Sequence, residues 1–270
     1  MSHGVRSRRL DHESLLLTRV FWTVNGKTKK EISLSKLLTN DITFRQVTEI
    51  YRWLLDPKRW LKTLSGRGEQ SGHLPMDTPV DPFHVNTIEI IRREVNGIFK
   101  NGNLLVCSKR LNLIGVIDPQ TERLVWSWGK DYLVHPHHPT LLDSGNLLIF
   151  DNGSRKRRPY SRIIELSPVT NKIVWKYEAV PREAFFTTWG GANQRLANGN
   201  TLVTDSESGR VFEIDGEGEV VWEFYNPEKA DNGDRATIYR MMRIVDPDRV
   251  AMIEGMMGEK NQLRMKGRAQ

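Results

Sequence analysis

The chain has 270 residues, enough for one large domain or two small ones, and a formal net charge of +7. Its single cysteine, Cys107, excludes an internal disulfide, and we expect this thiol in the buried core. No run of eighteen apolar residues occurs, so no membrane-spanning helix is predicted, and the first residues lack the apolar core of a signal peptide. The basic runs RSRR, RKRR and RMKGR indicate solvated surface or attraction of anionic ligands. They lack the interleaved aromatic residues of a single-strand binder, so no nucleic-acid partner is expected.

Residues 1–80 differ in texture from the rest of the chain. Residues 18–38 predict a strand, a turn and a second strand, which is typical of a divergent propeller blade. Residues 43–64 have apolar side chains at helical spacing, which predicts a short helical insertion that Pro57 interrupts. Residues 66–82 are rich in Gly, Pro and polar side chains and predict a loop.

From residue 98 onward the sequence repeats itself. Each unit contains a Gly-Asn turn, an apolar strand, a second strand that ends near an acidic residue, a turn, and a strand with a Val-Trp pair. The Gly-Asn turns begin at Gly102, Gly145 and Gly199, so successive turns are 43 and 54 residues apart. This period is close to the ~40–50 residues of one four-stranded propeller blade.

The strands of these units are almost continuously apolar, as expected where neighbouring sheets cover both faces. Trp126, Trp175 and Trp222 recur at one position of the unit, and we interpret them as packing residues between blades. The sequence therefore predicts an all-β fold, a β-propeller core over residues 81–258. Residues 237–255 are expected to form a strand, a turn and a strand, and residues 259–270 a basic disordered tail.

Polar residues interrupt the apolar pattern where inner strands begin or end. Such loops gather around the axis of a propeller, so these residues are expected to converge. A cluster of His, Asn, Lys, Arg and Thr is typical of an anion site with a nucleophile or an acid–base pair. The residues concerned are His84, Asn86, Lys109, Arg110, His137, His138, Thr237, Tyr239 and Arg240, whereas His135 is expected on the surface.

Residues 81–245 resemble the arylsulfotransferase family, the bacterial type with a six-bladed propeller that uses phenolic sulfates. The resemblance consists of DPFHVN, GNLLVCSKRLNLIGVID, HHPTLLDSGNLLIFDNG, SRIIELSPVTNKIVWKY, QRLANGNTLV with GRVFEI, and TIYR, in this order. The family's proteins are much longer. The resemblance therefore implies an incomplete or partly divergent six-bladed propeller, with one or two N-terminal blades lacking or changed.

The resemblance also implies roles for individual residues. His137 matches the family's sulfurylated histidine, and His138 is the alternative nucleophile. His84 and Asn86 match the histidine and asparagine of its HVN motif, and Thr237 matches the threonine of its TxYR motif. The family has an arginine where this chain has Lys109, and Arg110 beside it is the alternative sulfuryl-binding cation, because lysine offers only a point charge and not a planar fork.

The implied reaction moves a sulfuryl group from a phenolic sulfate ester to an acceptor phenol through a sulfohistidine, which predicts ping-pong kinetics. His84 is the implied acid and base, while Asn86, Thr237 and Lys109 or Arg110 hold the sulfuryl oxygens. The resemblance implies no cofactor and no metal, and small-molecule phenolic partners. The compartment stays open, because the family is typically periplasmic or exported, and so does a homo-oligomer.

Three alternatives remain from the residues alone. The first is a non-catalytic propeller that binds a partner or an anion, because the Lys109 position departs from the family. The second is a zinc site at HPHH, although adjacent histidines rarely aim three rings at one ion. The third is a quinone-dependent dehydrogenase propeller, which the Val-Trp repeats resemble but for which no acidic calcium site is evident.

Overall fold

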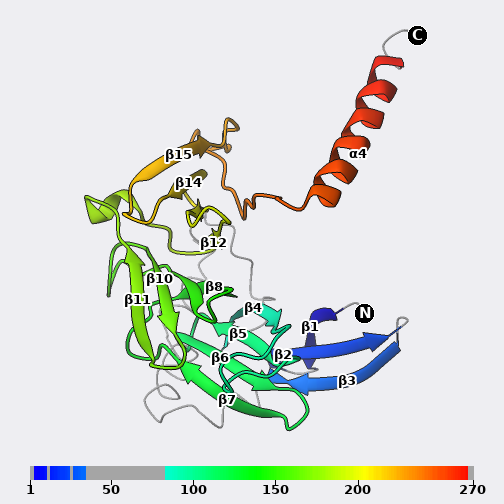
Figure 1. The fold of residues 1–270 in the computed structure, drawn as a ribbon, viewed down its shortest axis with the longest axis vertical. Helices are drawn as coiled ribbons and strands as arrows, with labels where there is room; N and C mark the ends of the chain where they lie inside the picture. Colours follow the sequence, from blue (N-terminus) through cyan, green and yellow to red (C-terminus); the bar gives the residue numbers. More distant parts are fainter. Residues whose placement is uncertain (1–2, 11–12, 25–26, 35–82, 267–270) are drawn as a thin grey trace.

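The computed structural model describes the backbone of residues 3–10, 13–24, 27–34 and 83–266, and the side chains of residues 31–34 and 83–257. The predicted helical insertion over residues 43–64 and the loop after it lie outside the described residues. Antiparallel strands dominate the described part, and three successive four-stranded sheets form its centre (Figure 1).

Each of the three sheets is a blade whose strands follow one another in chain order. Blade 1 consists of β4 (Val85–Ile90), β5 (Leu104–Ser108), β6 (Leu113–Asp118) and β7 (Arg123–Trp128). Blade 2 consists of β8 (Pro136–Leu141), β9 (Leu147–Asp151), β10 (Arg162–Ser167) and β11 (Lys172–Tyr177). Blade 3 consists of β12 (Ala192–Arg195), β13 (Thr201–Asp205), β14 (Arg210–Ile214) and β15 (Val220–Tyr225). This arrangement is that of a partial β-propeller, which confirms the predicted fold class.

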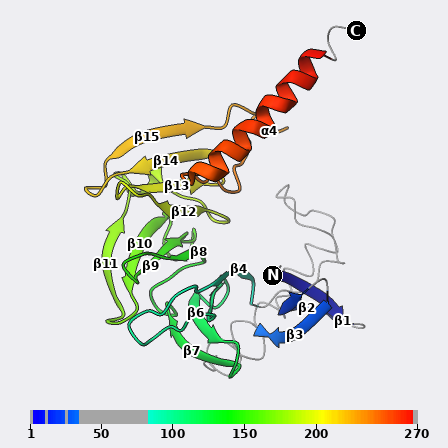
Figure 2. The same cartoon turned by 45° about the vertical axis from the view of Figure 1, so that its right-hand side comes forward.

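The first strand of each blade is the inner one. β8 lies against both β4 and β12, and the three blades fan outward from this line of strands (Figure 2). Each sequence repeat supplies the three outer strands of a blade, and the polar segment ahead of it supplies the inner strand. The register shifts between Val85 and Thr87 in β4 and between His137 and Thr140 in β8, so both inner strands are irregular where the predicted site lies.

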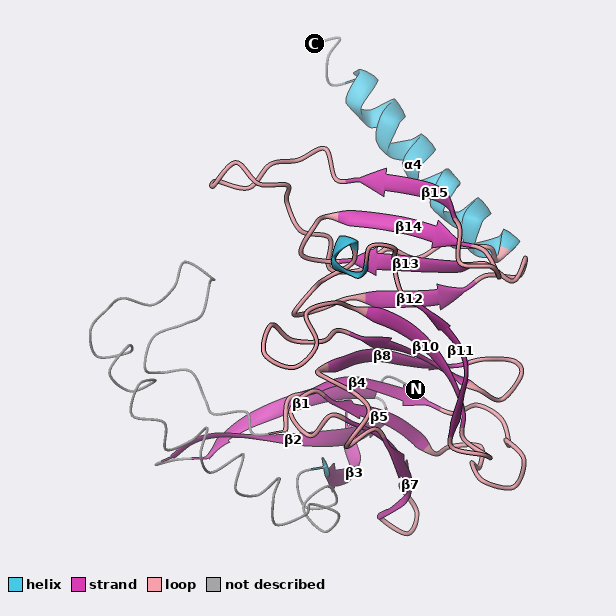
Figure 3. Cartoon of the chain, turned by 90° about the vertical axis from the view of Figure 1, so that its left-hand side faces the viewer, coloured by secondary structure: helices cyan, strands magenta, loops and turns pink. Residues whose placement is uncertain are grey.

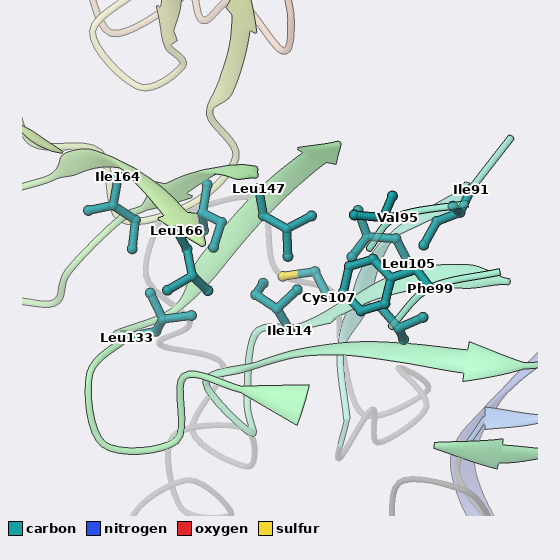
Figure 4. Close-up of a cluster of buried hydrophobic side chains, with 12 residues drawn as sticks. Ile91, Val95, Phe99, Leu105, Cys107, Ile114, Leu133, Leu147, Ile164 and Leu166 are labelled. Atoms are coloured by element: carbon teal, nitrogen blue, oxygen red, sulfur yellow. The ribbon is translucent and has the colours of Figure 1, made fainter. Parts of the chain in front are cut away.

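Apolar side chains fill the space between neighbouring blades. Between blades 1 and 2, fully buried residues from both sheets meet around Phe99, Cys107 and Ile149 (Figure 4 shows most of this cluster). The predicted burial of Cys107 is confirmed. Between blades 2 and 3, the rings of Phe150, Phe185 and Phe212 meet at edge-to-face angles, a geometry that aromatic quadrupoles favour.

Trp126 and Trp175 occupy equivalent places at two successive blade interfaces. Trp126 Nε1 donates to Asn171 Oδ1 of blade 2 at 3.1 Å, and Trp175 Nε1 donates to the Gly216 carbonyl of blade 3 at 3.4 Å. Both acceptors lie in the turn between the third and fourth strands of the next blade. Each ring also packs on the apolar cluster between its own blade and the next. Trp126 and Trp175 therefore pack between blades, as their recurrence predicts, whereas Trp222 is exposed, with the Arg243 guanidinium 5.6 Å from its ring centroid.

A three-stranded sheet precedes the blades in the sequence. It has the order β1 (His3–Leu10), β2 (Glu13–Val24) and β3 (Lys27–Ser33), and it lies beside blade 1 (Figure 3). Buried Ile32 and Leu34 pack against Leu104, Val106 and Ile117 of that blade. β2 and β3 are the predicted strand, turn and strand, whereas β1 was not predicted.

The C-terminal part differs from the prediction of a strand, a turn and a strand. Residues from Pro247 onward form helix α4 (Pro247–Lys266), which continues into the segment expected to be a disordered tail. The Asp246 side chain accepts a hydrogen bond from Arg249 N at 3.0 Å, and Pro247 takes the first helical position. This is a common start signal of helices that the sequence interpretation overlooked. The boundaries placed at residues 80 and 258 stay predictions.

Also among the described residues, the short η1 (Arg182–Ala184) precedes β12. In the described part of the chain, no helix combines the length and the apolar character needed to cross a membrane.

Candidate active site

The histidine-bearing ends of the inner strands have unusual backbone conformations. His84 precedes β4 with a φ of 46°, and His135 and His138 flank His137 with φ values of 56° and 44°. Residues other than glycine seldom adopt positive φ, and such conformations gather at functional sites. The loop before β8 is fixed from two sides, because Val134 N donates to Asp151 Oδ1 and His135 N donates to Asn112 Oδ1, both at 2.8 Å.

Asn86 joins the inner strands of blades 1 and 2. Its Nδ2 donates to the Pro136 carbonyl at 2.9 Å, and its Oδ1 accepts from Thr87 Oγ at 3.2 Å. The same carbonyl also accepts from Cys107 Sγ at 3.2 Å. Asn86 thus binds Pro136, the residue before His137, and its amide holds β8 against β4.

His137 is buried at the start of β8. Its Nδ1 lies 2.7 Å from Asn152 Oδ1 and 3.1 Å from the His135 carbonyl. The pKa of His137 is lowered to about 4, chiefly by burial and also by the charges of Lys109 and His84, against the raising effect of the two hydrogen bonds. The imidazole is therefore neutral at pH 7, which is the state a nucleophilic histidine needs.

His138 is buried as well but faces other partners. Asn193 N donates to its Nδ1 at 3.2 Å, and Asn193 Nδ2 donates to its carbonyl at 3.0 Å, so this residue joins blade 2 to blade 3. Its pKa is lowered to about 4 by burial first and by the charge of Arg240 second. Adjacent in sequence, His137 and His138 are held by different blades.

Cations surround this group of histidines. Burial lowers the pKa of His135 to about 4, and the charges of Lys109, Arg110 and Arg157 act in the same direction. The pKa of Lys109 is itself lowered by burial and by Arg110, while Glu207 of blade 3 opposes the shift. Lys109 follows β5 and Glu207 follows β13, so the ends of the second strands of blades 1 and 3 approach each other at the site. Its positive potential suits an anionic ligand.

The charges of Lys109 and His84 act on His137, and those of Lys109, Arg110 and His84 act on His135. Thr237 lies on a separate segment and is exposed; its carbonyl accepts from Asn226 Nδ2 at 3.5 Å.

This separate segment runs along blade 3. Ile238 N donates to the Ser206 carbonyl at 3.2 Å, and Met241 N donates to Thr204 Oγ at 3.0 Å. From this segment it is Arg240, three residues after Thr237, whose charge acts on His138.

Asn152 and Asn193 were not predicted as site residues. Asn152 belongs to the FDNG stretch, where the sequence indicates a turn, and Asn193 follows two glycines in a stretch without an apolar pattern. Both are buried, and each contacts a histidine of the site. Proximity of an asparagine to a histidine across about 15 and 55 residues leaves no local signal.

In the described residues, no group of three or more His, Cys, Asp or Glu side chains is arranged to hold a metal ion. The ring Nδ1 atoms of His137 and His138 are each engaged with an asparagine. The Nδ1 atoms of His137 and His138 are therefore not directed at one common metal ion.

The fold defines the class of this molecule: a β-propeller protein with buried histidines and nearby cations at its inner strands. Residues 55–227 match the profile of the family described as Arylsulfotransferase (ASST). Because this match covers more than half of the chain, the chain belongs to the arylsulfotransferase family. No curated protein matches it.

Several solved structures are similar in part. A structure of the Dos1 propeller aligns with a TM-score of 0.45 at 12% identity, over 82% of this chain and 47% of that one. Virginiamycin B lyase from Staphylococcus aureus aligns with a TM-score of 0.41 at 12% identity, over 88% and 69%. A protein of unknown function from Bacteroides caccae aligns with a TM-score of 0.39 at 17% identity, over 56% and 51%. The chain thus spans about half the length of the Bacteroides caccae and Dos1 structures.

Proposed function

We propose that the chain is an aryl sulfotransferase that moves a sulfuryl group from a phenolic sulfate ester to an acceptor phenol. The observation that supports this most directly is His137, a buried imidazole that is neutral at pH 7 and lies close to the cations of the site. Membership of the arylsulfotransferase family supports the reaction class. The proposed intermediate is a sulfohistidine at His137.

In the first half of the reaction, the lone pair of a His137 ring nitrogen attacks the sulfur of the donor. The nitrogen–sulfur bond forms, the bond between sulfur and the aryl oxygen breaks, and the phenolate leaves with the bonding pair. His84, in its protonated form, gives a proton to that oxygen. In the second half, the acceptor phenol gives its proton to His84 while its oxygen attacks the sulfur, and the electron pair returns to His137. Splitting the transfer in this way avoids one difficult direct step.

The sulfuryl oxygens need donors and positive charge where the negative charge develops. Lys109 and Arg110 at the end of β5 are the proposed cations of blade 1, as the resemblance implies. Arg240 is the further cation that the structure adds to the proposal, since its charge acts on His138. Asn86 and Thr237 stay proposed ligands. In the structure, Asn86 donates to the carbonyl of Pro136, the residue before His137. Thr237 lies on the same segment as Arg240.

A non-catalytic propeller that binds an anion is the second candidate. The observation that favours it is that the Asn86 amide is engaged with the Pro136 carbonyl, while Lys109 stands where the family has an arginine. Such a protein would keep the positive site and lack the transfer.

Intact-protein mass spectrometry distinguishes the two functions. The protein is incubated briefly with 4-nitrophenyl sulfate, and both the sulfuryl adduct and the release of nitrophenolate are measured for the parent, His137→Ala and His138→Ala. Transferase function at His137 predicts an adduct in the parent and in His138→Ala but not in His137→Ala. An adduct lost only in His138→Ala would move the nucleophile to His138. Absence of adduct and of phenol release from folded parent protein would favour the binding propeller.

A further inference from the structure

The orientation of the Asn152 side-chain amide follows from its own hydrogen bonds. Its Nδ2 lies 3.0 Å from the Thr187 carbonyl and 2.9 Å from the Gly190 carbonyl. Carbonyl oxygens only accept hydrogen bonds, so both amide hydrogens of Asn152 are used there. The side chain is fully buried, and exchanging its nitrogen and oxygen would set oxygen against two carbonyls. The atom that faces His137 is therefore Oδ1, an acceptor.

This orientation decides the tautomer of the neutral His137 ring. Its Nδ1 lies 2.7 Å from Asn152 Oδ1 and 3.1 Å from the His135 carbonyl, two acceptors without a proton. Only an Nδ1 that bears the hydrogen satisfies them. A neutral imidazole has a single ring hydrogen, so Nε2 retains its lone pair.

His138 has the opposite arrangement. Asn193 N is a backbone donor, and it lies 3.2 Å from His138 Nδ1. Nδ1 must accept this hydrogen bond, and the ring hydrogen of the neutral imidazole is therefore on Nε2. The orientation of Asn193 agrees, because its Nδ2 donates to the His138 carbonyl at 3.0 Å.

We propose that Asn152 is a positioning residue that holds His137 in the Nδ1–H tautomer, so that Nε2 is the nucleophilic nitrogen, whereas the Asn193 backbone holds His138 in the Nε2–H tautomer as a hydrogen-bond donor to the sulfuryl group. The inference rests on the proposed sulfuryl transfer for its chemical meaning. It gives two adjacent histidines separate roles: the ring with the free Nε2 pair attacks, and the ring with the Nε2 hydrogen donates.

The electron count of the transfer is consistent with this arrangement. As the Nε2 pair forms the bond to sulfur, the aryl oxygen leaves with its own pair and the His137 ring acquires positive charge. The Nδ1 hydrogen stays on the ring and remains donated to Asn152 Oδ1, and this hydrogen bond strengthens as the charge develops. Return of the pair to Nε2 in the second half restores the neutral ring.

The tautomers are measured in the parent protein, and site variants serve only to assign the signals. Protein labelled with ¹⁵N at histidine is examined by NMR at neutral pH, and the two rings are assigned by the signals that disappear in His137→Gln and in His138→Gln. We expect the hydrogen on Nδ1 of His137 and on Nε2 of His138. A hydrogen on Nε2 of His137, or the same tautomer in both rings, would overturn the inference. The result cannot be attributed to a folding defect, since the spectra are those of the parent protein.

Asn152→Asp then tests the positioning role. The carboxylate keeps an acceptor for Nδ1 and adds a negative charge that raises the pKa of His137, while its second oxygen faces the Thr187 and Gly190 carbonyls, so folding of the variant is checked first. We therefore expect the acid limb of the pH profile for adduct formation to move to higher pH. Asn152→Ala should slow adduct formation roughly 10²–10⁴-fold, the range for loss of a tautomer-fixing partner. Asn171→Asp is the matched control: Asn171 Oδ1 accepts from Trp126 Nε1 in the turn between β10 and β11, so the carboxylate keeps an acceptor there as well, and its profile should not move.

The outcomes separate this inference from the proposed function. Opposite tautomers without any sulfuryl adduct in the parent would leave the assignment of the rings standing and contradict the transfer. An adduct on His137 with a hydrogen on Nε2 in the resting protein would support the transfer and contradict the role of Asn152. An acid limb that does not move in folded Asn152→Asp would also contradict that role.

Discussion

The outer and inner strands of the three blades differ in how closely they repeat. The outermost strands β7, β11 and β15 each contain a tryptophan at the same place, and the first two use it for the same contact with the next blade. The inner strands β4, β8 and β12 have no common sequence, and the first two are irregular in register. The repeated residues therefore stabilise the scaffold, and the inner strands that do not repeat contain the residues of the candidate site.

The two regions also differ in what stabilises them. The interfaces between blades are apolar and depend on burial of large side chains, which contributes most of the stability of a small β-protein. Around His137 the buried groups are polar, and partners from two or three blades satisfy them. Changes to the scaffold should consequently act on the free energy of unfolding alone, whereas changes to the site should alter reactivity as well.

Phe99→Ala should give the largest effect on the scaffold. This ring is fully buried between blades 1 and 2, and its centroid lies 5.5 Å from that of Trp126 in an edge-to-face contact. Removing it should lower the free energy of unfolding by about 3–5 kcal/mol, because the cavity cannot collapse completely. Urea denaturation measures this loss. Phe99→Leu, which fills most of the volume, should lose clearly less, and an equal loss would contradict the packing explanation.

Acid should weaken the site region next. The folded-state pKa of His137 and of His138 is about 4, below the ordinary 6.5. The unfolded chain therefore binds more protons between these values, and stability present above pH 6.5 is lost as the pH falls toward 4. Each ring contributes at most roughly 3 kcal/mol to this loss.

Denaturation curves at pH 7 and pH 4.5 for the parent and for a His137→Gln, His138→Gln double variant isolate this contribution. The double variant should lose less stability on acidification than the parent. Equal losses would show that other groups, such as the carboxyl groups, account for the acid sensitivity.

Lys109 should have a smaller effect, on reactivity and not on stability. Lys109→Met removes a charge-assisted contact to the sulfuryl oxygens, for which about 1.5–3 kcal/mol is typical, so adduct formation should slow by roughly 10–100-fold. Lys109→Arg should keep or raise the rate, since its fork can hold two oxygens. Single-turnover release of nitrophenolate measures both variants. A Lys109→Met variant as fast as the parent would remove Lys109 from the site.

The blades could be predicted from the sequence because their signals are local. Gly-Asn turns, apolar runs and recurring tryptophans lie within a few residues of the structures they produce. The inner strand β12 (ANQR) was not recognised, because it is short and polar where it adjoins the site. Helix α4 was missed because Asp246 and Pro247 were interpreted as a turn between strands, although they also form a helix start.

The site was only partly predictable for the same reason. His84, Lys109 and His137 came from the family resemblance and lie within electrostatic reach in the structure. Asn152 looked like a turn residue, because its contacts to Thr187 and Gly190 join segments 35 and 38 residues apart. Contacts of this kind depend on how the blades are arranged and leave no trace in the local pattern.

The smallest predicted effect tests the repetition itself. Trp126→Phe keeps most of the ring and removes the donor to Asn171 Oδ1, so it should lower the free energy of unfolding by about 0.5–1.5 kcal/mol. Trp175→Phe should cost less, because its hydrogen bond to the Gly216 carbonyl is longer, at 3.4 Å. Chemical denaturation resolves this order. Asn171→Gly, which suits the φ of 56° at this position, is the matched control: combined with Trp126→Phe it should add little, because both changes remove the same hydrogen bond. Full additivity would mean that the two residues stabilise the blades separately, and that the repeated tryptophan acts through its apolar surface alone.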